Sequence, residues 1–420
     1  MKILKKLVIE GGRDISGTIK ISGAKNSIVA LIPASILTSG VCVITNVPDI
    51  SDVRILIDMM RELGSIITFE NEVLTIDNSN VQNKKITEEY AGKLRASYYF
   101  MGSLIGKYHE AEIAYPGGCV IGSRPINYHI ESFKKMGINV KNVADHYIMK
   151  TDELKGNEFY FDFPSVGATI NIMLAAILAK GKTIIYNAAK EPEIANVASF
   201  LNSMGAKVFG AGTSTIEIIG VEELHDGFVE VIPDRIEAGT YIMIGALIGN
   251  NLKIENIVEK HLESLLYKLK EAGVKYEINN NSIILSKVEH LKPVNIKTTV
   301  YPGFPTDLGQ PMSTFLTQCE GESLFEETIY ENRLRHVPHL NSMGANIQAF
   351  DKKAIIMGKT PLVGKKVKAT DLRAGASMLV AGLIATGTTE IQNIEHLLRG
   401  YERIVEKLES VGVNIKLIDE

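Results

Sequence analysis

The residues best suited to chemistry lie in one segment, residues 115–125, which reads YPGGCVIGSRP. Its three glycines and two prolines predict a loop of defined shape that can move. Cys119 stands in the middle, five residues before Arg124. Because a nearby guanidinium stabilises the thiolate, we expect this cysteine to be reactive near neutral pH. The alternative is an inert cysteine buried in a turn.

The other two cysteines, Cys42 and Cys319, lie in or beside apolar runs and are expected to be structural. All three are far apart in the sequence, and no Cys-x-x-Cys or Cys/His spacing indicates a zinc site or a disulfide framework. We therefore expect a cytosolic protein that holds no metal ion.

Charges also stand at the start of several of six expected helices that are apolar nearly all round. These helices span residues 24–37, 96–105, 168–179, 238–248, 308–317 and 374–385. A helix N-terminus offers free N–H groups and a partial positive charge, which suit phosphates and carboxylates. Lys25, Arg95, Asp307 and Arg373 stand at four of these starts. The alternative is that such residues only cap their helices, as Asp307 could do after Thr306.

A repeated scaffold must position these helices. Each is followed by an amphipathic helix, a glycine and a short alternating strand, with the glycines 68 to 73 residues apart. The six glycines are Gly64, Gly137, Gly205, Gly273, Gly344 and Gly412. A fixed period of this length predicts one supersecondary unit in six copies. Each copy should contain a strand, a buried helix, a strand, an amphipathic helix and two strands.

Length and composition limit the organisation and the class of function. The 420 residues divide into two domains of three copies, one of residues 23–232 and one of residues 1–22 plus 233–420. The net charge of −4 and the absence of tryptophan give no reason to expect nucleic acid as a partner. The apolar runs fall short of the roughly 18 residues that span a membrane, and the N-terminus does not read as a signal peptide.

Nine short motifs occur in an order that closely resembles the UDP-N-acetylglucosamine 1-carboxyvinyltransferase family of enolpyruvyl transferases. They lie at residues 22–26, 94–97, 116–119, 191–194, 233–237, 304–307, 331–333, 369–373 and 399–402. The resemblance implies an α/β fold in which two domains, each of three βαβαββ units, form an inside-out barrel with the active site in the cleft between them. It also implies transfer of the enolpyruvyl group of phosphoenolpyruvate to the 3'-hydroxyl of UDP-N-acetylglucosamine. Phosphate is released, no cofactor takes part, and the step is the first committed one of peptidoglycan synthesis.

The resemblance assigns roles to individual residues. Cys119 matches the catalytic cysteine, a general acid that fosfomycin alkylates, and Asp307 matches the base for the sugar hydroxyl. The phosphoenolpyruvate-binding positions match Lys25, Asn26, Arg124 and Arg399, and Lys25 and Arg399 are also expected to be catalytic. The remaining substrate-binding positions match Arg95, Pro125, Ile126, Asn127, Tyr128, Ser165, Val166, Ile329, Arg333, Asp371 and Arg373. Arg124 and Asp307 are expected to contact the nucleotide sugar as well.

Some positions depart from the family's commonest pattern. Asn127 and Tyr128 replace the usual Asp-Leu or Asp-Gln, Leu398 replaces an aspartate before Arg399, and Gly309 stands where glutamine is common. Residues 163–164 stand where other members carry a lysine. Two alternatives remain open. One is the sister activity, 3-phosphoshikimate 1-carboxyvinyltransferase, whose family lacks the cysteine loop, and the other is a catalytically weak regulatory paralogue.

Overall fold

The computed structural model describes residues 5–117 and 126–419, which form two compact units. Unit I consists of residues 23–117 and 126–232, and unit II of residues 5–22 and 233–419. Within residues 5–117 and 126–419, the chain passes from one unit to the other between residues 22 and 23 and between residues 232 and 233. Each unit has a hydrophobic core of its own.

The described strands of unit I form three sheets. The first has the order β13 (Gly227–Glu230), β3 (Val41–Thr45), β5 (Val73–Asp77) and β4 (Ile66–Glu70). The second has the order β6 (Glu110–Ala114), β8 (His146–Lys150) and β7 (Asn139–Val143). The third has the order β9 (Glu158–Tyr160), β10 (Lys182–Tyr186), β12 (Thr215–Ile219) and β11 (Lys207–Phe209). In the second sheet the expected first strand is reduced to a single parallel bridge between Ile86 and Ile113.

The described strands of unit II also form three sheets. The first has the order β2 (Thr18–Lys20), β14 (Leu252–Glu255), β16 (Ser282–Leu285) and β15 (Tyr276–Asn279). The second has the order β17 (Ile296–Lys297), β18 (Gly321–Glu326), β20 (Lys353–Gly358) and β19 (Asn346–Phe350). The third has the order β21 (Lys366–Lys368), β22 (Thr388–Gln392), β1 (Lys5–Glu10) and β23 (Asn414–Asp419). The N-terminal strand β1 pairs antiparallel with both β22 and β23, so it completes the sheet of the sixth repeat.

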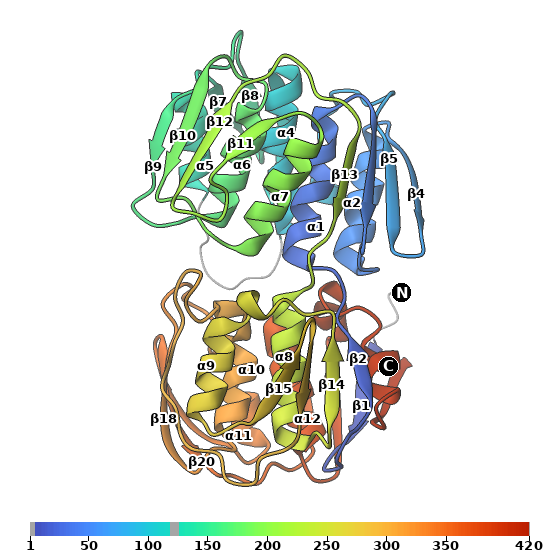
Figure 1. Cartoon of the computed structure of the whole chain (residues 1–420), viewed down its shortest axis with the longest axis vertical. Helices are drawn as coiled ribbons and strands as arrows, with labels where there is room; N and C mark the ends of the chain where they lie inside the picture. Colours follow the sequence, from blue (N-terminus) through green and yellow to red (C-terminus); the bar gives the residue numbers. More distant parts are fainter. Residues whose placement is uncertain (1–4, 118–125, 420) are drawn as a thin grey trace. The chain divides into compact units, whose positions relative to one another are not determined.

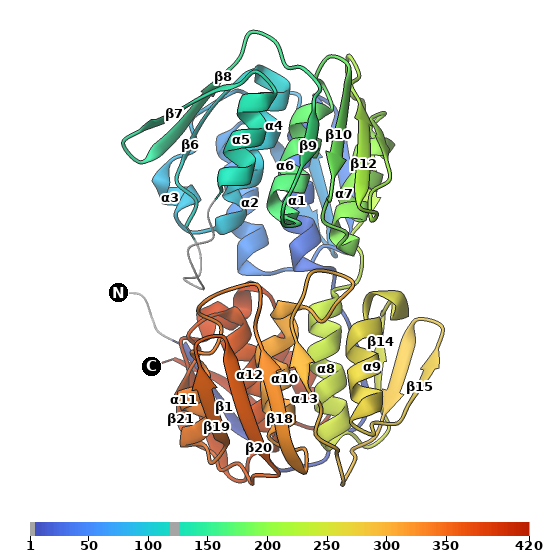
Figure 2. The ribbon, with the colours of Figure 1, turned by 90° about the vertical axis from the view of Figure 1, so that its left-hand side faces the viewer.

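Long apolar helices occupy the interior of each unit, and strands lie at its periphery (Figures 1 and 2). In unit I they are α1 (Lys25–Ala34) with the 3-10 turn η1 (Ser35–Leu37), η2 (Arg95–Tyr98) with α4 (Tyr99–Tyr108), and α6 (Val166–Ala176). In unit II they are α8 (Arg235–Ile248), α10 (Thr306–Leu316) and α12 (Leu372–Ile384). These six match the apolar helices that the sequence predicts, with boundaries shifted by no more than three residues.

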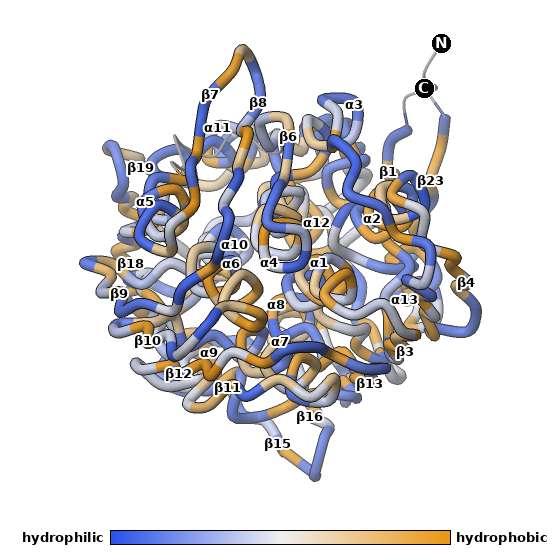
Figure 3. The backbone as a smooth tube through the Cα atoms, turned by 90° about the horizontal axis from the view of Figure 1, so that it is seen from above, coloured by the Kyte–Doolittle hydropathy of each residue, from blue (hydrophilic) through white to orange (hydrophobic). Residues whose placement is uncertain are grey.

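The remaining helices are shorter or amphipathic. They are α2 (Ser51–Glu62), α3 (Glu88–Ala91), α5 (Asn127–Lys135), α7 (Pro192–Ser203), η3 (Glu259–His261), α9 (Glu263–Glu271), α11 (Val337–Ser342), η4 (Ile394–Arg399) and α13 (Ile404–Glu409). Hydrophobic and hydrophilic stretches alternate along the backbone, as elements with one buried face require (Figure 3). None of the described helices is long and apolar enough to cross a membrane.

The six marker glycines confirm the repeat in backbone geometry. Each follows an amphipathic helix with φ between 88° and 110°, a left-handed conformation that glycine adopts without a Cβ clash. At Gly64 the N–H groups of residues 64 and 65 donate to the carbonyls of Arg61 and Met60, at 2.9 and 3.0 Å. A glycine is therefore needed at each site because the helix must end there and turn into the next strand.

Candidate functional site

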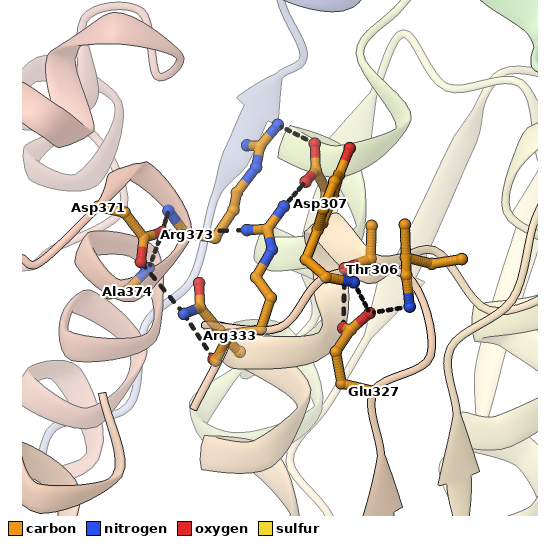
Figure 4. A network of polar contacts seen from close by, with 10 residues as sticks. Thr306, Asp307, Glu327, Arg333, Asp371, Arg373 and Ala374 are labelled. Carbon is orange, nitrogen blue, oxygen red and sulfur yellow. Dashed lines mark hydrogen bonds and ion pairs between the residues drawn. The ribbon is translucent and has the colours of Figure 1, made fainter. Parts of the chain in front are cut away.

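A network of charged side chains gathers at the N-terminal end of α10 in unit II (Figure 4). The helix begins after Pro305, whose extended backbone (φ −73°, ψ 133°) makes it the N-cap residue. Asp307 is the second residue of the helix, so the expectation that it could be the helix cap is wrong. Its carboxylate instead accepts hydrogen bonds from two arginines.

Each oxygen of the Asp307 carboxylate accepts a hydrogen bond from a different arginine. Arg333 donates from Nη2 to Oδ1 at 2.6 Å, and Arg373 donates from Nη2 to Oδ2 at 2.8 Å. The two arginine side chains are only 5% and 4% exposed, whereas that of Asp307 is 23% exposed. The carboxylate is thus held from the protein side and remains reachable from solvent.

The charges of this network compensate one another. Arg333 Nη1 lies 3.9 Å from an oxygen of Asp371, so two carboxylates face two guanidinium groups. Burial by itself would lower the pKa of Arg373. The negative charge of Asp307, with weaker contributions from other groups, outweighs this effect and raises the pKa above its ordinary value. The pairing with Asp307 therefore keeps Arg373 cationic in spite of its burial and fixes its orientation.

Two further carboxylates hold the backbone around this network. Asp371 is the N-cap residue of α12 and accepts from the N–H groups of Arg373 and Ala374 at 2.9 and 3.1 Å. Glu327, which is 1% exposed, accepts from the Thr306 hydroxyl at 2.8 Å and from the Ile329 N–H at 2.7 Å. The helix that carries Asp307 and the loop that carries Ile329 are thereby joined.

In unit I, Lys25 is the first residue of α1 and pairs with a buried carboxylate. Its Nζ lies 3.0 Å from Oδ2 of Asp52, whose side chain is fully buried, while the Lys25 side chain is 14% exposed. Asn26 follows in the same turn and is half-buried. This ion pair fixes a cation at the N-terminal end of a helix, where the free N–H groups also favour anions.

Arg95 begins η2 and lies beside aromatic and backbone groups of unit I. Its guanidinium carbon is 6.0 Å from the centre of the Tyr98 ring, and Nη1 is 3.5 Å from the Pro116 carbonyl. The Tyr98 ring in turn meets the buried His129 ring edge-on at 5.0 Å. Burial, and to a smaller extent the charge of Arg95, lowers the pKa of His129 to about 3, so this imidazole is neutral.

The other predicted nucleotide-sugar residues of unit I lie at the starts of two helices. Ile126 is the buried residue before α5, Asn127 is exposed, and the Tyr128 ring packs 5.4 Å from that of Phe161. The hydroxyl of Ser165 caps α6 by accepting from the Ala168 N–H at 3.3 Å, and Val166 follows it.

Arg399 ends η4 in unit II and is half-buried, with Leu398 packed against the core beside it. Cys119, Arg124 and Pro125 lie outside the described residues. The two described cysteines, Cys42 and Cys319, are buried, and burial raises the pKa of each thiol to about 12. Neither is therefore suited to act as a nucleophile.

The structure brings Asp307, Arg333, Asp371 and Arg373 into one network within unit II, whereas Lys25, Asn26, Arg95 and the α5 and α6 residues belong to unit I. Sequence reasoning missed the partner Asp52. The sequence feature that could have revealed Asp52 is its position four residues before Leu56, which places an aspartate on the buried face of α2. Among residues 5–117 and 126–419, no group of three or more histidine, cysteine, aspartate or glutamate residues could hold a metal ion.

Comparison with known proteins identifies the family. Residues 9–408 match the family described as EPSP synthase (3-phosphoshikimate 1-carboxyvinyltransferase). The chain belongs to this enolpyruvyl transferase family. Among enolpyruvyl transferases with curated names, UDP-N-acetylglucosamine 1-carboxyvinyltransferase 2 of Listeria monocytogenes is 49% identical over 98% of this chain and 97% of its own. The protein of the same name from Bacillus cereus is 50% identical over 98% and 96%.

Solved enolpyruvyl transferases share the fold. NikO from Streptomyces tendae superposes with a TM-score of 0.88 at 24% identity over the whole of both chains. An EPSP synthase from Acinetobacter baumannii superposes with a TM-score of 0.74 at 18% identity, over 99% of this chain and all of its own. These comparisons confirm the predicted fold class, the two-domain α/β architecture of the enolpyruvyl transferases.

Proposed function

We propose that this chain transfers the enolpyruvyl group of phosphoenolpyruvate to the 3'-hydroxyl of UDP-N-acetylglucosamine and releases phosphate. The observation that carries the proposal is the likeness to UDP-N-acetylglucosamine 1-carboxyvinyltransferases, at about half identity over nearly the whole length. The paired Asp307 in unit II supports it, because the reaction needs a group that accepts the proton of the sugar hydroxyl. This would be the first committed step of peptidoglycan synthesis.

The proposed reaction is an addition followed by an elimination. The 3'-oxygen of the sugar attacks C2 of phosphoenolpyruvate and gives up its proton to Asp307, while C3 takes up a proton from Cys119. The resulting tetrahedral adduct carries both the sugar oxygen and the phosphate on C2. Loss of phosphate, together with loss of one proton from C3, restores the double bond and completes the transfer.

The anionic donor requires several cations in fixed positions. We assign this role to Lys25, Arg124 and Arg399, with Asn26 as a polar companion and Arg373 near the reacting centre. Two observations support it for the described residues. The Lys25 ammonium is oriented by the fully buried Asp52, and the Arg373 guanidinium is oriented by Asp307. Side chains held in this way lose little conformational entropy when they bind a phosphate or a carboxylate.

We assign binding of the nucleotide sugar to the remaining predicted residues, again as part of the proposal. Arg95, with Tyr98 beside it, could hold a diphosphate or uracil group, and the α6 residues Ser165 and Val166 offer helix N-terminal N–H groups. The exposed Asn127 and half-buried Tyr128 are proposed uridine contacts. A cytosolic location is supported by the buried thiols Cys42 and Cys319, neither of which forms a disulfide.

The deciding experiment measures phosphate release with phosphoenolpyruvate and one of two acceptors, UDP-N-acetylglucosamine or 3-phosphoshikimate. Turnover with the nucleotide sugar alone is expected. Turnover with 3-phosphoshikimate alone would establish the sister activity instead. No turnover with either acceptor at saturating concentrations would leave only a binding or regulatory role and would refute the proposal.

A second experiment tests the cysteine. Fosfomycin, an epoxide phosphonate that resembles phosphoenolpyruvate, should add one adduct to Cys119, and faster in the presence of UDP-N-acetylglucosamine. Intact-mass measurement followed by peptide mapping locates the adduct. Cys42 and Cys319 are internal controls, because both are buried with pKa values of about 12. An adduct on either of them would contradict the assignment.

A further inference from the structure

A glutamine lies inside the arginine network, one turn of helix after Asp307. Gln310 belongs to α10 and is 1% exposed. Its Nε2 donates to the backbone carbonyl of Arg333 at 2.9 Å and lies 3.3 Å from Oδ2 of Asp371. A buried amide is costly unless it is hydrogen-bonded, and these two bonds connect α10 to distant parts of the chain.

The two acceptors belong to the two segments that supply the arginines around Asp307. The carbonyl is that of Arg333 itself. Asp371 caps α12 through its other oxygen, which accepts from the N–H of Arg373 at 2.9 Å. One amide on the helix of Asp307 therefore contacts both the loop that carries the first arginine and the helix start that carries the second.

A second contact fixes the same loop farther along. Ser313 lies one turn below Gln310 on α10, and its Oγ lies 2.6 Å from Nε2 of His336 and 2.7 Å from the carbonyl of Gln310. His336 is fully buried, and burial lowers its pKa to about 4. The loop from Arg333 to His336 is thus attached to α10 at both ends by uncharged groups.

We propose that Gln310 is a positioning residue that holds Arg333 and Arg373 on the Asp307 carboxylate during enolpyruvyl transfer. The inference rests on the proposed function, in which Asp307 accepts the sugar proton. The chemistry of the side chain supports it. An amide offers two N–H donors without charge, which suits one carbonyl and one carboxylate, whereas glutamate offers no donor and would repel Asp371.

The chain supplies a matched control on the same two helices. Thr314, also on α10, shares a hydrogen bond of 2.6 Å with Ser377 on α12, and both residues are fully buried. This pair joins α10 to α12 as Gln310 does, but the Thr314 hydroxyl bonds the hydroxyl and carbonyl of Ser377, not Arg333, Asp371 or Arg373. Loss of the Ser377 hydroxyl should therefore lower stability without changing the chemistry.

The experiment compares Gln310→Met and Gln310→Glu with wild type and Ser377→Ala, all assayed well below their melting temperatures. We expect kcat to fall about 10- to 100-fold in both Gln310 variants, because misplacing a reacting group by about 1 Å costs about that much. The KM for UDP-N-acetylglucosamine should rise by a smaller factor than kcat falls, since a displaced Asp307 loses one contact with the bound sugar but most of its action as proton acceptor. Ser377→Ala should keep its kcat within about twofold.

Amide hydrogen exchange gives a readout that does not depend on activity. The amides of Arg373 and Ala374 and of residues 333–336 should exchange faster in Gln310→Met than in wild type, and remain unchanged in Ser377→Ala. Unchanged exchange and unchanged kcat in Gln310→Met would overturn the proposal, as would a failure of both Gln310 variants to fold. If wild type itself shows no turnover, the proposed function fails, and the exchange data alone decide whether Gln310 holds the two segments.

Discussion

Replacing Asp307 with asparagine should slow the reaction and destabilise unit II at the same time. The amide oxygen can still accept from one guanidinium, but the amide NH₂ then faces the other, which is 4% or 5% exposed. A hydrogen bond between charged groups contributes about 1.5–3 kcal/mol, and an orphaned buried charge costs more. Because the Asp307 side chain is 23% exposed, water replaces part of the loss, and we expect about 2–3 kcal/mol.

The substitution should lower both kcat and the melting temperature. Removing a general base typically costs about 10²- to 10⁴-fold, so kcat for phosphate release should fall by at least about 100-fold. The melting temperature should fall by roughly 4–12 °C, given about 2–4 °C per kcal/mol for a unit of this size. Both quantities are measured on the same preparation, by a coupled phosphate assay and by thermal unfolding.

The matched control is Glu237→Gln. Glu237 is a carboxylate of α8 in the same unit, 2% exposed in its side chain and 2.6 Å from Lys407. It accepts hydrogen bonds from Lys407 and from the Ser22 N–H, not from Arg333 or Arg373. This variant should lose stability while its kcat stays within about threefold of wild type. A kcat for Asp307→Asn within threefold of wild type would refute its assignment as the proton acceptor. An unchanged melting temperature would refute the energetic argument for the network.

Three further predictions concern other parts of the two units. Asp52→Asn should raise the KM for phosphoenolpyruvate about tenfold, because Lys25 loses its partner at 3.0 Å; an unchanged KM would exclude this pair from binding. Gly309→Ala would place a Cβ 2.8 Å from Cζ of Phe325, so the melting temperature should fall. In a Phe325→Leu background, where the ring is absent, the same substitution should lower the melting temperature less. His129 has its pKa lowered to about 3 by burial, so the unfolded chain binds a proton below pH 6.5 that the folded chain does not. Stability is then lost as pH falls from 6.5 toward 3, and His129→Gln should lose about 2 kcal/mol less than wild type between pH 7 and pH 5, as measured by urea unfolding.

Local patterns along the chain were sufficient for the scaffold. The apolar helices and the glycine after each amphipathic helix were predicted from periodicity and turn chemistry, and the structure contains them. These features depend on interactions within a few residues, such as the left-handed turn at Gly64. Two strands depart from the predicted pattern. The first strand of the second repeat shortens to the bridge between Ile86 and Ile113, and the last strand of the sixth repeat is β1 from the start of the chain.

Residue types at the candidate site were predicted, but their partners were not. Asp307 accepts hydrogen bonds from arginines 26 and 66 residues away, and no sequence pattern specifies which charges meet over such separations. The buried partner of Lys25 and the donor Gln310 were missed for the same reason. A polar side chain in an apolar helix can be recognised in the sequence, whereas the groups that it bonds depend on how other helices pack against it.

The sequence by itself therefore determined the repeat and the fold class, and it predicted a set of residues for enolpyruvyl transfer. Periodicity and turn chemistry act over a few residues, and the motifs specify residue types directly. Only the tertiary structure decided that Asp307 lies between two buried arginines instead of capping α10, and that Gln310 bonds the Arg333 carbonyl and Asp371. The physical reason is that burial and long-range pairing arise from packing, which determines the charges that lose water and the groups that replace it.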